Sequence, residues 1–385
     1  MFSKLASVFE ELEKPRAQRP FGSGWLSGSL AVLMGVLSVA GVLVLRFPAT
    51  FTSPDLGPIH DLIPLRMIVN ALLIGGYLFA VLSLLLSRKP TLPIAGFFLI
   101  VLAALMYGVP LETGGEALPI YFGLDFFILK VLTVGLLFLP LERLWPHRSE
   151  QTVLRTEWRE DFFYFAFSTL MVQVLNYLTL APTQVVNNSF DLASIRHYLF
   201  ELPLLIQIGL IMVATDFLQY WIHYAFHKFP LLWRFHKIHH SAQKMDWIAG
   251  ARMHFFEIAI LRGLTALPML TLGFSPTAVQ GYLVFVYFYS AFIHANIGWK
   301  FGPLERFLVT PRFHHWHHGS EREALDINFA SHFPLFDWLF GTYHLPDEER
   351  WPEDYGVRGE EMPHGYLKQF MVPFFGAKKV SAPDE

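Results

Sequence analysis

Cysteine is absent from this sequence of 385 residues, and charged residues are few. The lack of cysteine excludes disulfides, cysteine-ligated zinc, iron–sulfur clusters and thiol catalysis within the chain. Only 16% of the residues are charged, the formal net charge is −3, and the basic residues form no stripe, so nucleic acid is not an expected partner. Any metal ion would therefore be bound by histidine, aspartate or glutamate side chains.

Apolar residues dominate what is present. They make up 53% of the chain, with 38 phenylalanines and a mean hydropathy of +0.39, outside the usual balance of a soluble domain. A helix needs about 20 apolar residues to span a bilayer. Runs near this length lie at 25–45, 67–86, 92–109, 122–139, 162–180 and 204–224. A further run at 258–295, broken by Gly273 and Pro276, predicts two helices joined by a tight turn.

These runs predict an all-α membrane protein, because lipid admits only helices or closed barrels and nothing here alternates as barrel strands would. The number of spans stays open, since Lys130 interrupts the fourth run and the third is short. The first run has no small-residue cleavage site behind it and is interpreted as a retained membrane helix. Loops rich in Lys and Arg lie before the first run, after the second and before the fifth. Such loops stay on the cytoplasmic side of the membrane, so these three are predicted to be cytoplasmic.

Histidine is concentrated in one part of the chain. Twelve of the 17 histidines lie between His223 and His332. The three densest motifs are His223-x-x-x-His227, His236-x-x-His239-His240 and His314-His315-x-His317-His318. Residues four apart share one face of a helix, so the outer pair of each motif projects two imidazoles toward one point. His239 and His317 each lie one residue from such a pair and can reach a second ion.

A single pair of histidines four residues apart is more often solvated than bound to metal. Three such motifs at the ends of membrane helices indicate metal binding, because imidazoles near hydrocarbon are costly and usually functional. Imidazole suits iron, copper and zinc, and so many imidazoles without a thiolate favour more than one ion. Five isolated histidines are interpreted as ordinary loop or interface residues: His60, His147, His197, His344 and His364.

The order of these motifs resembles the fatty acid hydroxylase and sterol desaturase superfamily over residues 155–346. Shorter strings match in order and spacing: Arg252-x-His254-x-x-Glu257, His294-x-Asn296, Thr310-Pro311-Arg312-Phe313 and Asp326-x-Asn328. The resemblance implies ten metal ligands: His223, His227, His236, His239, His240, His254, His294, His314, His317 and His318. Two roles are open for His254, a metal ligand or a residue that supports a ligand, since Phe255 follows it where the related pattern often has proline. His315 and His332 are weaker candidates.

Four polar residues near the histidines are candidates for orienting them: Asp216, Glu257, Asn296 and Asn328. A metal-bound imidazole normally donates its other N–H to a carboxylate or a carbonyl oxygen. Asp326 and Asp337 fit the same role. The alternative roles are helix capping, turn capping, and ion pairs with Arg252 or Arg312.

The resemblance implies a membrane enzyme that holds two iron ions and uses O2 to oxidise a C–H bond of a lipid or sterol. Hydroxylation is the expected outcome, and desaturation at the same di-iron site is the alternative, because the histidines do not distinguish the two. A histidine-rich metal transporter or sensor is the third interpretation. It is disfavoured because a transporter places its ligands near the membrane midplane.

The reaction also consumes electrons, and the sequence shows no Gly-x-Gly-x-x-Gly turn and no recognisable haem domain. We expect a separate donor, a reductase with a cytochrome b5-like or ferredoxin-like carrier, docking on loops that include Lys237 and Lys244. The ordinary preference of basic loops for the cytoplasmic side explains these lysines equally well. The predicted regions are 1–150 (N-terminal transmembrane), 151–346 (hydroxylase-like catalytic) and 347–385 (C-terminal cytoplasmic tail). The expected whole is an all-α, multi-pass transmembrane protein with a cytoplasmic, histidine-rich di-metal cap. A bacterial inner membrane is favoured over the endoplasmic reticulum.

Overall fold

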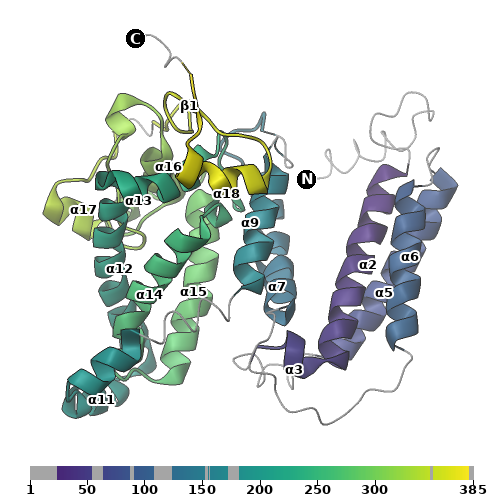
Figure 1. The fold of residues 1–385 in the computed structure, drawn as a ribbon, viewed down its shortest axis with the longest axis horizontal. Coiled ribbons are helices and arrows are strands. Elements are labelled where there is room, and N and C mark those ends of the chain that lie inside the picture. The colour runs from purple at the N-terminus through teal and green to yellow at the C-terminus, as the bar shows by residue number, and fades with distance from the viewer. Residues whose placement is uncertain are drawn as a thin grey trace. The chain divides into compact units, whose positions relative to one another are not determined.

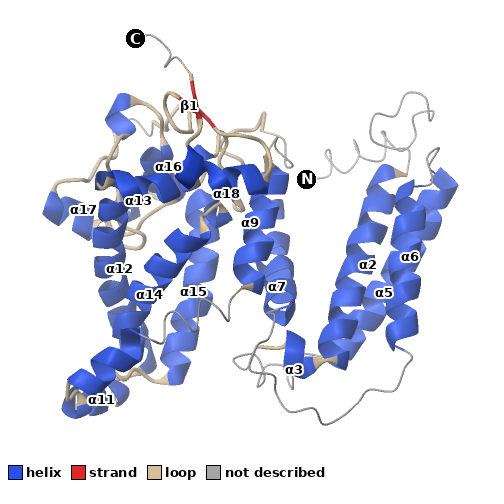
Figure 2. Ribbon diagram, in the orientation of Figure 1, coloured by secondary structure: helices blue, strands red, loops and turns tan. Residues whose placement is uncertain are grey.

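The structure is a computed structural model, and it describes residues 24–53, 64–86, 91–107, 124–151, 155, 157–171, 182–346 and 350–380. These residues form two compact units that meet in sequence between Leu129 and Lys130. Their regular structure is helical (Figure 1, Figure 2), apart from one antiparallel pair of very short strands, β1 (Glu360–Glu361) and β2 (Lys378–Lys379). The prediction of an all-α fold is confirmed.

The N-terminal unit is built from apolar helices. They are α2 (Trp25–Arg46), the short α3 (Pro48–Phe51), α5 (Leu65–Leu86) and α6 (Thr91–Tyr107). Small residues let these helices approach closely, and a Cβ placed on Gly96 would lie 2.7 Å from the Cβ of Ala31. Arg46 at the end of α2 donates to the Met106 carbonyl oxygen over 2.8 Å, which ties α2 to the end of α6.

The second unit contains the helices that position the histidines. In chain order its elements are the end of α7 (Leu124–Lys130), η3 (Val131–Gly135), α8 (Leu136–Leu144), α9 (Trp158–Leu170), α11 (Ala193–Phe200), α12 (Leu204–Lys228), α13 (Pro230–His236), η4 (His239–Ser241), η5 (Ala249–Ala251), α14 (Phe255–Thr271), α15 (Pro276–His294), η6 (Gly302–Arg306), α16 (Pro311–His318), η7 (Arg322–Ala324), α17 (Leu335–Phe340) and α18 (Tyr366–Phe375). Val134 and Phe138 form a buried cluster with Ala291 of α15 and with Ala295 and Ile297, which follow that helix. This packing places most of the fourth apolar run in the second unit. The boundary between the two units therefore comes before position 150, the predicted end of the N-terminal region.

The expected hairpin at 258–295 corresponds to α14 and α15. Gly273 between them has a φ of +81°, a conformation that favours glycine. The Ser275 hydroxyl accepts the N–H of Ala278, and Pro276 occupies the first position of α15, so the helix begins directly after the turn. α15 then runs back to the end of the unit at which α14 begins (Figure 1).

Four helices of the described chain are long and apolar enough to cross a membrane: α2, Leu65–Leu84 of α5, α12 and α15. α6 is a shorter apolar helix. The expected run at 162–180 begins in α9, and its residues 172–180 lie outside the described part. α14 has 17 residues, fewer than the about 20 of a typical span, and it also contains Arg262 and Pro268. These helices fit the predicted multi-pass membrane protein.

The histidine-rich segments lie at one end of α12, α14 and α15 (Figure 1). α13 follows α12 after Phe229, with Pro230 at its first position. α16 begins after Thr310, whose hydroxyl accepts the N–H of Phe313. Phe313 and Tyr220 of α12 belong to one buried hydrophobic cluster, which packs α16 against α12.

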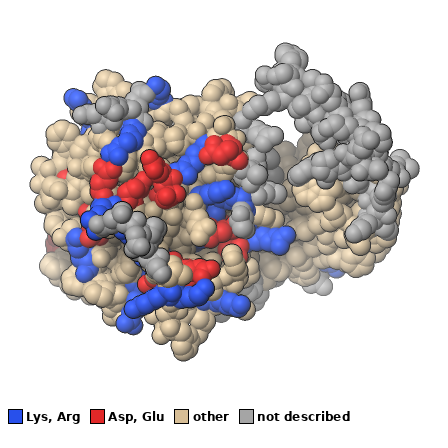
Figure 3. Space-filling model, turned by 90° about the horizontal axis from the view of Figure 1, so that it is seen from above, with Lys and Arg blue, Asp and Glu red and all other residues tan. Residues whose placement is uncertain are grey.

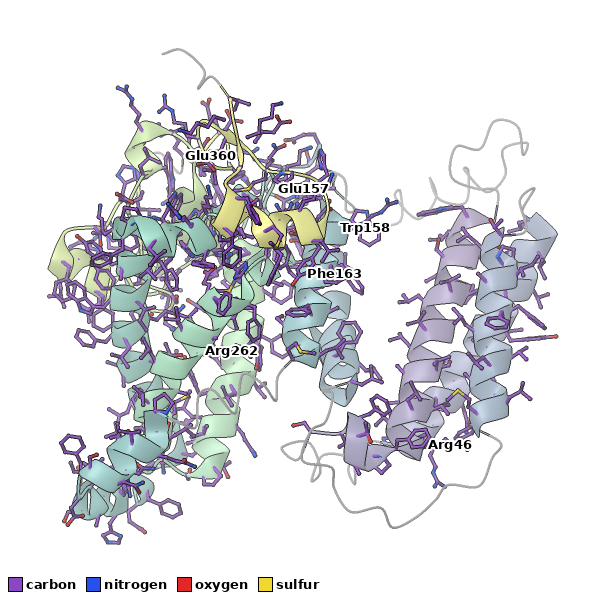
Figure 4. The ribbon with its side chains drawn as sticks, in the orientation of Figure 1. Arg46, Glu157, Trp158, Phe163, Arg262 and Glu360 are labelled. Carbon is purple, nitrogen blue, oxygen red and sulfur yellow. The ribbon has the colours of Figure 1, made fainter. Side chains whose placement is uncertain are left out.

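Buried ion pairs hold the loop after η4 against α9. Arg155 Nε lies 2.8 Å from Asp246 Oδ2, and the same guanidinium contacts Asp161. Arg252 also contacts Asp161 and lies 3.2 Å from Glu157 Oε1, beside the start of α9 (Figure 4). A buried charge left unpaired would be strongly destabilising, so this pairing is a condition for bringing the loop and its neighbouring histidines to one place.

Candidate metal centre

Nine of the ten predicted ligands gather in two groups. The first group is His223, His227, His236, His240 and His317, and the second group is His239, His294, His314 and His318. Within each group, one ligand atom from every residue lies within 4.8 Å of the others. The groups are adjacent, because the rings of His240 and His318 stack with centroids 4.4 Å apart.

The two groups share sequence motifs. Successive residues of a helix point about 100° apart, so His317 turns away from His314 and His318 and joins the first group. His239 likewise leaves the pair that ends at His240 and joins the second group. Two of the three motifs therefore supply both groups, which keeps the groups side by side.

The Nε2 atoms within each group face one another. In the first group, His236 Nε2 lies 3.1 Å from His240 Nε2. In the second group, His314 Nε2 lies 3.0 Å from His294 Nε2 and 3.1 Å from His318 Nε2. Two nitrogen ligands about 2.1 Å from one ion and at right angles around it would be about 3.0 Å apart. The observed separations therefore suit ligands of a shared ion.

Backbone carbonyls decide which ring nitrogen carries the hydrogen in four of these histidines. A carbonyl oxygen only accepts, so the Nδ1 atom facing it must donate, and Nε2 keeps a lone pair. This arrangement occurs in both groups. The pairs are His223 with Phe329, His317 with Ile327, His239 with Arg252 and His294 with Ser290, at Nδ1–O distances of 2.8, 2.7, 3.1 and 2.7 Å.

Converging lone pairs repel unless a cation lies between them. Among the described residues, the buried Nε2 of His317 has no hydrogen-bond partner, which is unusual for a polar atom in a protein interior. Burial lowers the pKa of His239, His240 and His314 well below the usual histidine value, because a charged imidazole is poorly solvated there. Neutral imidazoles with a free Nε2 bind iron, copper or zinc. Each group therefore fits a metal ion.

Glu257, one of the predicted polar residues, contacts a histidine of the first group. Its Oε1 atom lies 2.6 Å from His236 Nδ1, and both side chains are buried. Because Glu257 stands in the first turn of α14, the helix delivers the carboxylate to the histidine at the end of α13. The contact holds the His236 ring so that Nε2 points into the group.

The other three predicted polar residues act on the backbone around the histidines. Asp216 accepts the N–H of Ser331 at 2.8 Å, and Asn296 Oδ1 accepts the N–H of Arg148 at 2.8 Å. Asn328 donates to two backbone carbonyl oxygens. None of the hydrogen bonds described for these three residues reaches a ring of either group, so they can orient the histidines only through the backbone.

His254 lies outside both groups, and we remove it from the proposed ligand set. It precedes α14 as the N-cap residue, with Nδ1 accepting the Phe256 N–H at 3.2 Å. Its Nε2 lies 3.2 Å from the Phe370 carbonyl oxygen, to which it donates. Both ring nitrogens are therefore occupied, and the capping position turns the ring toward α18 and away from the metal centre.

Two further histidines are buried near the groups. His315 Nε2 donates to the His294 carbonyl oxygen at 3.1 Å, and its Nδ1 lies 2.9 Å from the Tyr355 hydroxyl oxygen, so His315 braces the end of α15. His332 Nδ1 lies 3.3 Å from Asp216 Oδ1. Sequence reasoning did not find the carbonyl oxygens that orient the ligands, because a backbone contact leaves no mark on residue type.

The surface expected to receive an electron carrier differs in one respect from the prediction. Lys237 is buried and its ammonium group pairs with Glu360, whereas Lys244 is exposed. Seen from the cap end, acidic and basic side chains are interspersed (Figure 3). Lys237 is therefore unavailable to a partner, and a carrier would meet a surface of mixed charge.

The part of the chain that matches known proteins is the part that contains the histidine groups. Residues 208–342, which contain both histidine groups, match the family model described as fatty acid hydroxylase. The chain is 28% identical over 243 residues to ornithine lipid hydroxylase OlsE of Rhizobium tropici, covering 61% of this chain and 70% of that protein. No solved structure matches.

Two further relatives share a shorter region. The chain is 30% identical over 137 residues to alkylglycerol monooxygenase of Homo sapiens, covering 36% of this chain and 30% of that protein. It is 31% identical over 146 residues to very-long-chain aldehyde decarbonylase GL1-6 of Oryza sativa subsp. indica, covering 35% of this chain and 22% of that protein. The chain thus spans less than a third of the length of these two relatives.

Proposed function

Because the chain belongs to the fatty acid hydroxylase and sterol desaturase superfamily, we propose that it is a membrane-bound di-iron oxygenase that hydroxylates a C–H bond of a lipid. The observation that carries the proposal is the pair of adjacent all-histidine groups with converging Nε2 atoms. Relatives named as an ornithine lipid hydroxylase and an alkylglycerol monooxygenase support hydroxylation of a lipid.

Redox chemistry favours iron over zinc in this proposal. Imidazole ligands alone admit iron, copper and zinc. Zinc has no redox chemistry, whereas an oxygenase must transfer electrons to O2. Two iron ions, one held by each group, would supply the activation of O2 that breaks the C–H bond.

The residues of the chain orient the metal ligands and exclude water from the site. In five of the nine histidines, Glu257 or a backbone carbonyl faces Nδ1 and holds a hydrogen there, so that Nε2 of these rings stays available as a ligand. The rings of Phe329 and Trp233 pack against His227 with centroids 5.0 and 5.1 Å away. Phe329 is fully buried, and such aromatic walls exclude water from the place where a lipid carbon would lie.

Desaturation remains the second candidate outcome, because the ligands do not decide where a lipid carbon lies relative to the metals. The aldehyde decarbonylase among the relatives shows that the family includes more than one named reaction. A metal transporter is disfavoured, since both groups lie at one end of α12 and α15, away from mid-helix (Figure 1).

The proposed reaction needs an external electron donor, and we assign this role to a reductase with a cytochrome b5-like or ferredoxin-like carrier. The cationic loops support a cytoplasmic position for the metal centre, and we assign the protein to a bacterial inner membrane. A carrier in the cytoplasm would then reach the cap directly.

Lipid mass spectrometry of cells with and without the gene, grown under isotopically labelled O2, tests the proposal. A lipid that gains one labelled oxygen atom is the expected result, and loss of two hydrogens would identify desaturation. Cells expressing His240→Ala serve as the control, because this variant lacks one ligand of the first group. An unchanged lipid profile in active cultures, or purified active protein that contains zinc and no iron, would refute di-iron hydroxylation.

A further inference from the structure

One short loop, residues 326–329, contacts three of the five histidines in the first group. Two of the contacts are made by its backbone carbonyls and one by a carboxylate. The pairs are His223 with Phe329, His317 with Ile327 and His227 with Asp326, at Nδ1–O distances of 2.8, 2.7 and 3.3 Å. The Nδ1–carbonyl bonds described for the second group end elsewhere, on Arg252 and Ser290. The loop therefore serves one group selectively.

The backbone of this loop is in an unusual conformation. Asp326 and Asn328 have φ values of 59° and 58°, and they are the only non-glycine residues with positive φ in the described part of the chain. Asn and Asp adopt this left-handed region more readily than other side chains, yet it is sparsely populated and persists only when surrounding contacts fix it. Alternate residues in this conformation direct the neighbouring carbonyls of Ile327 and Phe329 toward the histidines.

Two buried side chains fix the loop. Asn328 donates from its amide nitrogen to the carbonyl oxygens of Phe313 and His344, at 3.1 and 2.7 Å, and its Oδ1 accepts the His344 N–H at 2.8 Å. Asp337 accepts the N–H groups of Phe329 and the next residue, at 2.7 and 2.9 Å. Asn328 thus links the loop to α16, which carries histidines of both groups.

We propose that Asn328, assisted by Asp337, is a positioning residue that holds the 326–329 loop as a carbonyl bracket for the first metal site alone. This inference rests on the proposed di-metal function. Without the bracket, the rings of His223 and His317 lose the acceptors that fix their orientation and keep hydrogen on Nδ1. The second site keeps its own carbonyls and its own ligands.

Asn328→Gly tests the bracket, because glycine adopts the left-handed backbone freely but removes all three side-chain hydrogen bonds. We expect full-length Asn328→Gly protein to bind about half as much metal as the unchanged protein, with one ion per chain where the latter holds two. Anaerobic titration of chelator-treated protein with Fe²⁺ should show affinity of one site reduced by about 10–100-fold and the other unchanged. The ion retained in the second site shows that the variant is folded.

Two companion variants complete the experiment. Asp337→Asn keeps one of the two carboxylate acceptors and should weaken the same site to a smaller extent. Asn187→Ala is the matched control, because the exposed Asn187 contacts Arg196 and should leave both sites intact. Two ions bound with unchanged affinity in Asn328→Gly, or equal loss from both sites in both loop variants, would overturn the bracket. If the wild-type protein binds fewer than two ions per chain, the proposed di-metal function itself is overturned.

Discussion

At the residue scale, the histidines of this protein are distinguished by what Nδ1 contacts. In His239, Nδ1 faces a carbonyl oxygen and must donate, which leaves Nε2 free. In His254, Nδ1 instead accepts a backbone N–H, and Nε2 donates to a carbonyl. Both side chains are buried and they lie 15 positions apart in sequence, yet only His239 has a lone pair to offer a metal ion.

This contrast predicts opposite results for two substitutions. His240→Ala removes a ligand of the first group and should abolish turnover and lower the metal content, while the protein still integrates into the membrane, because the spanning helices do not depend on metal. His254→Asn should retain the metal content of the unchanged protein, because asparagine also caps helices well. Metal analysis of purified protein measures both. Loss of metal in His254→Asn with an intact fold would return His254 to the ligand set.

At the element scale, α18 differs from an ordinary surface helix. Its exposed stripe is apolar, with Leu367, Met371, Phe374 and Phe375 exposed by 76, 41, 51 and 80%. These positions are spaced i, i+4, i+7 and i+8, so they form one face, and Gln369 lies buried on another. The helix lies across the histidine-rich end of the unit, packed against α13 and α9 (Figure 1). This orientation and this exposed stripe are typical of a helix lying in the membrane interface.

We therefore expect the exposed face of α18 to contact lipid. The chain has no cysteine, so a nitroxide label can be attached at Phe375→Cys alone, in protein reconstituted into vesicles. The label should collide more with O2, which concentrates in the bilayer, than with a water-soluble nickel chelate. Glu353→Cys, at an exposed position of the cap, is the control and should show the reverse preference. Equal preference at the two sites would place the α18 face in water.

At the scale of the whole molecule, the length of α12 sets the position of the metal centre relative to the bilayer. Its 25 residues extend about 37 Å, enough to cross a hydrocarbon core of about 30 Å. The segment with Ser189 precedes one end of α12, and the histidine groups lie at the other end (Figure 1). The two ends should therefore face opposite sides of the membrane.

Cysteine labelling in intact cells tests this sidedness. Ser189 and Lys244 are both exposed, so each can carry a single introduced cysteine. A membrane-impermeant thiol reagent should modify Ser189→Cys from outside and leave Lys244→Cys unmodified until the cells are opened. The cation-rich loops motivate this expectation, since such loops stay in the cytoplasm. Labelling of Lys244→Cys in intact cells would place the cap outside, and with it the docking site for the electron carrier.

Much of the fold follows from the sequence, because the bilayer imposes strong conditions on composition and length. Apolar runs near 20 residues predicted α2, α5 and α12, and the Gly273–Pro276 break predicted the turn between α14 and α15. The packing of units was not predictable in the same way. Val134 and Phe138 join the second unit through contacts with α15 and the residues that follow it, a long-range match of side-chain shapes that no local pattern encodes.

For the site, the sequence by itself determined the available chemistry: many imidazoles, no thiolate, and motifs spaced to bring ligands together at helix ends. Only the tertiary structure decided their division into two groups, with His239 and His317 crossing between motifs, and the exclusion of His254. The physical reason is that spacing specifies direction along one helix, whereas ligand convergence depends on how separate helices pack. The tautomers depend further on carbonyl oxygens such as that of Phe329, which every residue possesses and only the fold can aim.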